Sequence, residues 1–236
     1  MKSVNKSCKY IYIQHSAVGL TMAYDENAFV HFDVVQVINK FQSKEIDRIN
    51  ILKKKRIKKL KLRYLLFKYP KSHKKFITPR VLIAPTWNTD FYKLNLHNSI
   101  IKILDANKIE YIFKPHYMSD VKKEFEDKFL LNKNVVLNSN IIKDLQNYSH
   151  LITDWSGIFF EFTYINNKKS ILIQTNKKVR NLNYEKFNNN PIEIYARNII
   201  GNIISLNSIN QIPNLIQNEK LIDSEEIKSF YEKNFY

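Results

Sequence analysis

The sequence predicts an α/β fold in which a parallel sheet carries a ligand site at the carboxyl ends of its strands. Three short apolar segments, each followed by polar or turn-forming residues and then by a helical pattern, lie at Val81–Ala84, Ile109–Phe113 and Leu151–Thr153. Strands that alternate with helices are typical of parallel sheets. Ligands of open parallel sheets bind at the carboxyl edge, so three strand ends of this kind predict one site.

The remaining elements follow from the same patterns. Further strands are expected near 134–137 and 170–174, and helices over Leu96–Ala106 and Val121–Leu131. Before them we expect a strand at 10–14 and a helix around Ser43–Ile57, and after them an amphipathic helical region over Ser208–Tyr236. The predicted organisation is a first lobe over 1–70, a linker over 71–79 with prolines beside it, and a second lobe over 80–236.

The third strand end is the most informative segment. Thr153, Asp154, Ser156 and Gly157 lie between an apolar strand and the helical pattern that resumes at Ile158. The first backbone N–H groups of a helix have no partner within the helix, and together with the helix dipole they attract phosphate. An ordinary N-cap on a packing helix is the alternative, and it stays open on this segment alone.

Composition excludes several classes of site. Only three glycines occur, so a glycine-rich GxGxxG phosphate loop is absent. The single cysteine, Cys8, excludes a disulfide framework and fits a reducing compartment. No cluster of His, Cys or paired carboxylates has metal-ligand spacing, and no Gly-x-Ser-x-Gly elbow surrounds Ser156. We therefore expect neither a metal nor a cofactor, and we see no signal peptide or membrane span.

A basic segment, Lys53–Lys75, contains twelve of the 38 Lys and Arg residues and no acidic residue, in a chain of net charge +16. Ile57, Leu60, Tyr64 and Phe67 fall at helical spacing within it, although Arg63–Tyr69 also fits a strand. Such a surface is attracted to anionic lipid headgroups and to nucleic acid. A solvated surface is the alternative. Nucleic acid is the least favoured partner, because no helix-turn-helix, zinc-finger or RNP pattern occurs.

Four segments, in order, resemble motifs of the CDP-glycerol glycerophosphotransferase family, whose members build teichoic-acid-like and capsular polymers. They are Ile13–Ser16, Ala84–Trp87, Lys114–His116 and Ser149–Gly157. The resemblance spans about residues 9–200 and implies a glycosyltransferase-B-like fold of two Rossmann-like lobes. Members of the family usually carry a complete first lobe ahead of the histidine motif, so the resemblance implies a truncated first lobe here.

The resemblance also implies roles for individual residues. His15 matches the histidine proposed as general base, a role that suits the near-neutral pKa of imidazole. In place of the usual His-Gly-Thr-Pro, the chain has His15 followed by Ser16, Ala17 and Val18, which puts the identity of the acceptor in doubt. His150 replaces the aspartate of the family's Ser-Asp pair, which leaves Ser149 without its usual neighbour.

The other implied roles concern the nucleotide donor. Glu161 would bind the ribose, although its first-turn position also suits the helix dipole. Asp154 would structure the loop, because a carboxylate repels phosphate. The residues expected to bind the donor pyrophosphate are His116, Lys114, Ser149, Thr153, Ser156 and Gly157.

The expected function is transfer of glycerol phosphate, or a related polyol phosphate, from a CDP-activated donor to a hydroxyl of a lipid-linked cell-surface polymer. The expected location is cytoplasmic, on the inner face of the cell membrane, with Lys53–Lys75 on anionic lipid. Two alternatives stay open. One is a glycosyltransferase that uses a nucleotide sugar. The other is a non-catalytic truncated lobe that binds a membrane or nucleic acid.

Overall fold

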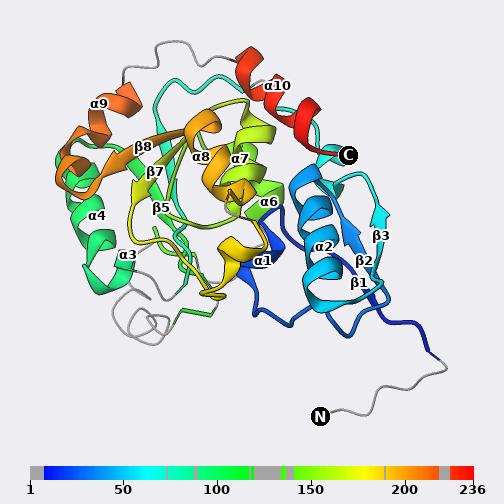
Figure 1. Ribbon diagram of the computed structural model, residues 1–236. Coiled ribbons are helices and arrows are strands. Elements are labelled where there is room, and N and C mark those ends of the chain that lie inside the picture. Colours follow the sequence, from blue (N-terminus) through cyan, green and yellow to red (C-terminus); the bar gives the residue numbers. More distant parts are fainter. Residues whose placement is uncertain are drawn as a thin grey trace. The chain divides into compact units, whose positions relative to one another are not determined.

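The computed structural model describes residues 8–72, 74–87, 90–116, 118–119, 134–136, 141–188, 190–217 and 224–236. The chain divides into two compact units, each with a parallel sheet (Figure 1). Unit 1 comprises Met1–Lys68, Lys178–Tyr195 and Tyr231–Tyr236, and unit 2 comprises Tyr69–Lys177 and Ala196–Phe230. The α/β class with parallel sheets is confirmed.

Unit 1 is built on three parallel strands in the order β1 (Ile11–Tyr12), β2 (Val34–Val37) and β3 (Lys58–Lys61). A short helix α1 (Leu20–Ala23) follows β1, and helix α2 (Lys40–Lys53) connects β2 to β3. The side chain of Asn39 caps α2 by accepting a hydrogen bond from the Gln42 N–H at 2.8 Å. The helix ends at Lys54, whose φ of 50° is left-handed. The core comprises Leu20, Phe29, Val35, Val37, Ile46, Ile49, Ile57 and Phe187.

Unit 2 is built on five parallel strands in the order β5-β4-β6-β7-β8. The strands are β4 (Arg80–Ile83), β5 (Glu110–Phe113), β6 (His150–Thr153), β7 (Ser170–Gln174) and β8 (Gly201–Ser205). Every residue of β6 is buried, as expected for a parallel strand covered on both faces. Helix α4 (Leu96–Ala106) has the predicted bounds, and its buried residues Leu96, Ile100 and Leu104 recur every four positions.

The described helices fill the connections between these strands. The others are α3 (Asp90–Lys93), α6 (Ile141–Asp144), α7 (Ile158–Asn166), α8 (Ile192–Ile200), α9 (Ile212–Gln217) and α10 (Ser224–Asn234). The 3₁₀ segments are η1 (Leu65–Lys68), η2 (Leu145–Asn147), η3 (Tyr184–Lys186) and η4 (Leu206–Gln211). Within the described ranges, no helix has both the length and the apolar character needed to cross a bilayer.

The strand order of unit 2 contains a topological switch point. From β4 the chain passes to β5 on one side, then returns to β6 on the other side of β4 and continues outward to β7 and β8. The connections after β4 and after β6 therefore run in opposite directions. Ligands of open parallel sheets bind at such a topological switch point, so the carboxyl ends of β4 and β6 are the expected position of a ligand.

Several predicted elements need correction. In the basic segment, the helix that the spacing indicated is wrong, because Lys58–Lys61 is an edge strand paired with β2. The alternative strand over Arg63–Tyr69 is also wrong, because Leu65–Lys68 is a 3₁₀ turn. The predicted strand 134–137 is an isolated bridge between Val135 and Phe113 in its described part. The predicted helix Val121–Leu131 lies outside the described residues.

The first boundary between the two units falls between Lys68 and Tyr69, next to the predicted end of the first lobe at residue 70. The predicted linker 71–79 belongs to unit 2, where the Ser72 N–H donates to the Ile165 carbonyl oxygen at 2.7 Å. The segment Lys178–Tyr195, which the sequence assigned to the second lobe, belongs to unit 1. Polar contacts hold it there: the Arg180 N–H donates to the Met22 carbonyl oxygen at 3.0 Å.

Candidate active site

The loops after β4 and β6 are joined by hydrogen bonds at the carboxyl edge of the unit 2 sheet. The Thr153 hydroxyl donates to the Ala84 carbonyl oxygen at 2.7 Å, and the Thr86 N–H donates to Asp154 Oδ1 at 2.7 Å. Thr153 and Asp154 have no exposed surface. Asp154 therefore structures the two loops. Thr153 does the same, because its hydroxyl is buried against Ala84, and we do not retain it as a phosphate ligand.

Helix α7 begins at this carboxyl edge and is a candidate site for an anion. Ser156 and Gly157 are partly exposed at its start, whereas Phe159 and Phe160 are buried and fix the helix in the core. No side chain caps α7 at Gly157, which has helical φ and ψ of −61° and −18°. The Phe159 and Phe160 N–H groups donate to the carbonyl oxygens of Ser156 and Gly157, so the Gly157 and Ile158 N–H groups and the Ser156 hydroxyl are the groups placed to bind phosphate oxygens.

Lys114 and His116 follow β5, the strand next to β4. The Lys114 N–H donates to the Ile83 carbonyl oxygen at 2.8 Å, which continues the pairing with β4. His116 Nδ1 accepts a hydrogen bond from the Met118 N–H at 3.2 Å, so the neutral ring carries its proton on Nε2 and can donate from there. Its ring centroid lies 6.4 Å from that of Trp87, in the loop after β4.

Lys114 contributes a positive charge at this edge of the sheet. The side chain is half-buried, and burial lowers the pKa of its ammonium group. A bound phosphate would oppose this shift, because a nearby negative charge favours the protonated form. Lys114 and His116 lie at the carboxyl end of β5, and Ser156 and Gly157 at that of β6, on either side of β4 at the same edge of the sheet.

Ser149 lies elsewhere than predicted, and Glu161 lies in the predicted first turn but is largely buried. Ser149 precedes β6 and lies at the opposite end of that strand from Thr153. At a rise of about 3.3 Å per residue, the two residues are about 13 Å apart along the strand. Its hydroxyl accepts from the Arg80 N–H at 2.8 Å and donates to the Arg80 carbonyl oxygen at 3.0 Å. The fold therefore does not bring Ser149 to the carboxyl edge of the sheet. Glu161, in the first turn of α7, is 6% exposed.

Arg197 stabilises the loop after β6, although no pattern in the sequence predicted a role for it. It projects from α8, is 2% exposed, and stacks its guanidinium 4.1 Å from the ring centroid of Trp155. Nη1 donates to the Asp154 carbonyl oxygen, and Nη2 donates to the Ile173 carbonyl oxygen at 3.3 Å. Burial lowers its pKa to about 10, which still leaves it charged at neutral pH. Arg197 thereby joins the loop after β6 to the end of β7.

In unit 1, His15 is exposed beyond the carboxyl end of β1. Its ring centroid lies 6.3 Å from that of Tyr24 in a T-shaped arrangement. An exposed imidazole at a strand end is accessible to a substrate hydroxyl and can accept its proton.

The loop after His15 is held by polar side chains of α2 and its cap. Asn39 Nδ2 donates to the Ala17 carbonyl oxygen at 3.0 Å, and Gln42 Nε2 donates to the Val18 carbonyl oxygen at 2.8 Å. Glu45 accepts from the Leu20 N–H at 2.7 Å. Asn39, Gln42 and Glu45 recur every three residues, so one helix face holds the loop.

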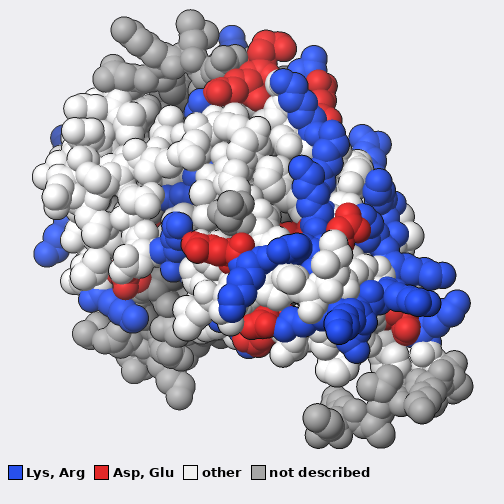
Figure 2. Space-filling view, viewed as in Figure 1, with Lys and Arg blue, Asp and Glu red and all other residues white. Residues whose placement is uncertain are grey.

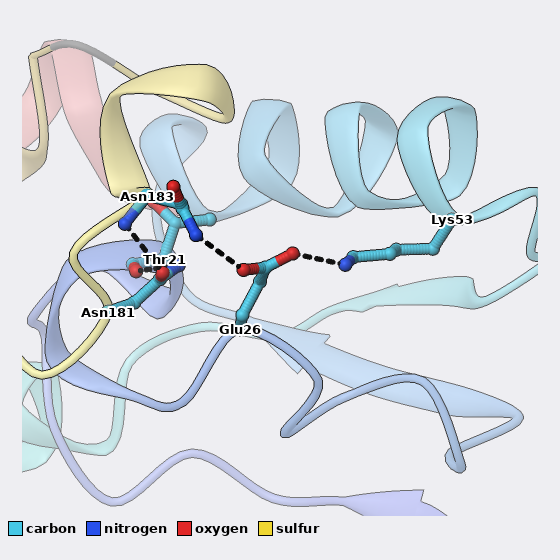
Figure 3. Close-up of polar contacts among 5 residues, drawn as sticks. All are labelled: Thr21, Glu26, Lys53, Asn181 and Asn183. Atoms are coloured by element: carbon cyan, nitrogen blue, oxygen red, sulfur yellow. Dashed lines mark hydrogen bonds and ion pairs between the residues drawn. The ribbon is translucent and has the colours of Figure 1, made fainter.

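A second set of contacts joins α1 and α2 to the segment Lys178–Tyr195 (Figure 3). Glu26 lies between Lys53 and Asn183: it forms an ion pair with Lys53 and accepts from Asn183 Nδ2 at 2.9 Å. These hydrogen bonds, the one to Lys53 first, lower the pKa of Glu26. Asn181 Nδ2 donates to the Thr21 carbonyl oxygen at 3.0 Å. Unit 1 thus fixes the far end of the His15 loop as well.

The comparisons with known proteins bear on identity. The family model described as CDP-Glycerol:Poly(glycerophosphate) glycerophosphotransferase matches residues 46–199. No curated protein matches the chain. A solved structure described as "Crystal Structure of TarM" aligns with 88% of this chain at 16% identity and a TM-score of 0.43. The chain spans 40% of the length of that structure.

The family match includes the candidate site residues of unit 2, from β4 through α7 to Arg197. It begins after His15, so the role of His15 rests on the residue and its position. Because the matched residues make up more than half of the chain, the chain belongs to the CDP-glycerol:poly(glycerophosphate) glycerophosphotransferase family.

Proposed function

We propose that the chain transfers glycerol phosphate, or a related polyol phosphate, from a CDP-activated donor to a hydroxyl of a teichoic-acid-like or capsular polymer. The observation that carries the proposal is the uncapped start of α7, which follows β6 at the switch point of the sheet, next to the end of β4 and within the residues that the family model matches. The arrangement suits a pyrophosphate, whose negative charge the helix start and Lys114 would both stabilise.

Each residue has a defined part in the proposed reaction. The acceptor oxygen attacks the phosphorus that carries glycerol, the bond from that phosphorus to the oxygen of CMP breaks, and CMP leaves. His15 takes the proton of the acceptor hydroxyl. His116 Nε2, Ser156 and the first N–H groups of α7 stabilise the charge on the pyrophosphate oxygens. Glu161 is proposed to bind the ribose.

The reaction is tested by mixing the chain with CDP-glycerol and a poly(glycerol phosphate) primer. Release of CMP in step with lengthening of the primer is expected. CMP release without lengthening would indicate hydrolysis, and activity with a nucleotide sugar but not with CDP-glycerol would favour a glycosyltransferase. Absence of both activities would favour the non-catalytic alternative.

We also propose that unit 1 docks on an anionic membrane through a basic strip, defined as residues 51–68. Figure 2 shows Lys and Arg side chains gathered over α2 and β3. Exposed apolar side chains accompany these cations, among them Ile51 at 66% exposed and Leu65 at 59%. Cations bind lipid headgroups while such apolar side chains enter the interface. The lipid-linked acceptor would then meet the chain at the inner face of the membrane.

Sedimentation with liposomes tests the docking proposal. The chain is expected to pellet with anionic liposomes, to pellet less as salt rises, and to remain in solution with neutral ones. Lys55→Glu and Lys58→Glu should each weaken binding at least about fivefold, because each cation contributes about 1 kcal/mol. Lys102→Glu, an exposed lysine on α4 outside the strip, is the matched control. Salt-independent pelleting, or none, would contradict docking.

A further inference from the structure

Two buried carboxyl groups of unit 1 meet at Gly19. Glu45 on α2 is 0% exposed, and Glu193 in the first turn of α8 is 3% exposed. A Cβ atom on Gly19 would lie 2.9 Å from Glu193 Oε2 and 3.0 Å from Glu45 Oε1. Those two oxygens are therefore at most 5.9 Å apart, the sum of the two distances. Glycine leaves the space that lets both carboxyl groups approach the loop.

The two carboxyl groups differ in their hydrogen bonds. Glu45 accepts from the Leu20 N–H at 2.7 Å, from the Thr21 hydroxyl at 2.7 Å and from Asn188 Nδ2 at 3.3 Å. Glu193 Oε2 is buried and has no hydrogen-bond partner among the described residues. Three donors stabilise the carboxylate of Glu45, whereas Glu193 is favoured as a carboxylate only by the backbone N–H groups of Gly19 and of Glu193 itself, and one of its buried oxygens has no partner among the described residues. Glu45 is therefore the charged member of the pair and Glu193 the neutral one.

The groups around the pair do not neutralise two charges. The α1 side contributes the Gly19 N–H and the Tyr24 phenol, α2 contributes Glu45, and the loop after η3 contributes Asn188. Within the described part of unit 1, no cation is among the groups that shift either pKa. Burial first, and then the charge of Glu45, raise the pKa of Glu193 to about 7. Burial also raises the pKa of Glu45.

We propose that Glu193 is held protonated against the Glu45 carboxylate, and that this pair positions the loop from His15 to Thr21. Glu45 holds the Leu20 and Thr21 end of the loop, and Glu193 lies against Gly19, four residues after His15. Ionisation of Glu193 places two like charges on the loop and separates its contacts. Glu193 is thus a positioning residue for the proposed base, and this part of the inference rests on the proposed function.

The proposal fixes a sign for the pH dependence of stability. In the unfolded chain Glu193 ionises near its ordinary pKa of 4.5, whereas in the folded chain it keeps its proton up to about 7. Between these values the folded chain binds more protons, so its stability falls as pH rises and levels off above the folded pKa. Replacement of Glu193 by a neutral amide removes this proton from the balance.

Thermal and denaturant unfolding from about pH 5 to about pH 8 test the pair without any need for catalysis. The slope of stability against pH gives the difference in protons bound by the folded and the unfolded chain. This difference is expected to be about one proton smaller in Glu193→Gln than in the natural chain. Glu185→Gln, an exposed acid of η3 in the same unit, is the matched control and should leave the slope unchanged. Equal slopes in the natural chain and Glu193→Gln would overturn the proposal. Failure of Glu193→Gln to fold would also overturn it, since a neutral group is what the pair requires.

The positioning role has its own readout. The transfer rate of the natural chain should decline as pH rises through about 7, and the decline should be smaller in Glu193→Gln but present in Glu185→Gln. A decline of the same size in Glu193→Gln would remove the positioning role and leave the buried pair. If no variant transfers glycerol phosphate while the stability slopes still differ, the proposed function fails and the protonated pair stands.

Discussion

Replacement of His15 by alanine is expected to reduce transfer at least about a hundredfold, because general-base catalysis contributes about 10²–10⁴ to a rate. The side chain is exposed, so its loss removes little packing and should leave the fold intact. Donor binding should stay within about twofold of the natural chain, because the donor site is proposed in unit 2. The measurement is the rate of CMP release in the presence of primer, together with the dissociation constant for CDP.

A matched control for this variant lies in the same unit. His31 is also an exposed histidine of unit 1, and His31→Ala should keep both rate and affinity. Full transfer activity in His15→Ala would exclude the proposed base. Loss of donor binding in a folded His15→Ala chain would show that His15 acts on the donor instead of the acceptor.

Replacement of Arg197 by methionine is expected to lower the free energy of unfolding by about 3 kcal/mol. Methionine fills a similar volume but leaves the carbonyl oxygens of Asp154 and Ile173 without their donors and removes the cation stacked on Trp155. Because Asp154 also holds the Thr86 N–H, nucleotide binding should weaken as well. Denaturant unfolding measures the first effect and calorimetry the second.

Arg180→Met is the control for loss of an arginine as such. The side chain of Arg180 is 57% exposed in its ion pair with Asp25, and exposed pairs contribute about 1 kcal/mol or less. If Arg197→Met were as stable as Arg180→Met, the guanidinium of Arg197 would not support the loop after β6 in the way its hydrogen bonds indicate.

The parts of the fold that were predictable have strong local signals. The strands β4 to β7 are short apolar runs bounded by polar residues, whereas β8 was not predicted, and α4 shows apolar residues every four positions from start to end. The carboxyl edge could be predicted as the place of the candidate site because parallel strands bring their ends together. Lys114, His116, Ser156 and Gly157 could be assigned to one edge before their contacts were known.

The parts that were missed depend on distant residues. Lys58–Lys61 has no apolar alternation, and it becomes a strand only through its pairing with β2. Ser149 was assigned to the donor because it matches the serine of the family's Ser-Asp pair, but strand direction puts it at the opposite edge of the sheet. Glu193 and Arg197 are four residues apart, a spacing typical of an exposed ion pair, and their burial follows from packing that periodicity does not encode.

The measurement that tests the donor site most directly is calorimetric titration of the chain with CDP-glycerol, CDP, CMP and UDP, repeated on three variants. Cytidine diphosphates are expected to bind, and His116→Ala and Ser156→Ala should each weaken binding at least about tenfold through loss of a charge-assisted hydrogen bond. Ser149→Ala, at the opposite edge of the sheet, should bind as the natural chain does. Absence of cytidine nucleotide binding by the folded natural chain, or equal binding by all three variants, would contradict a donor site at the start of α7.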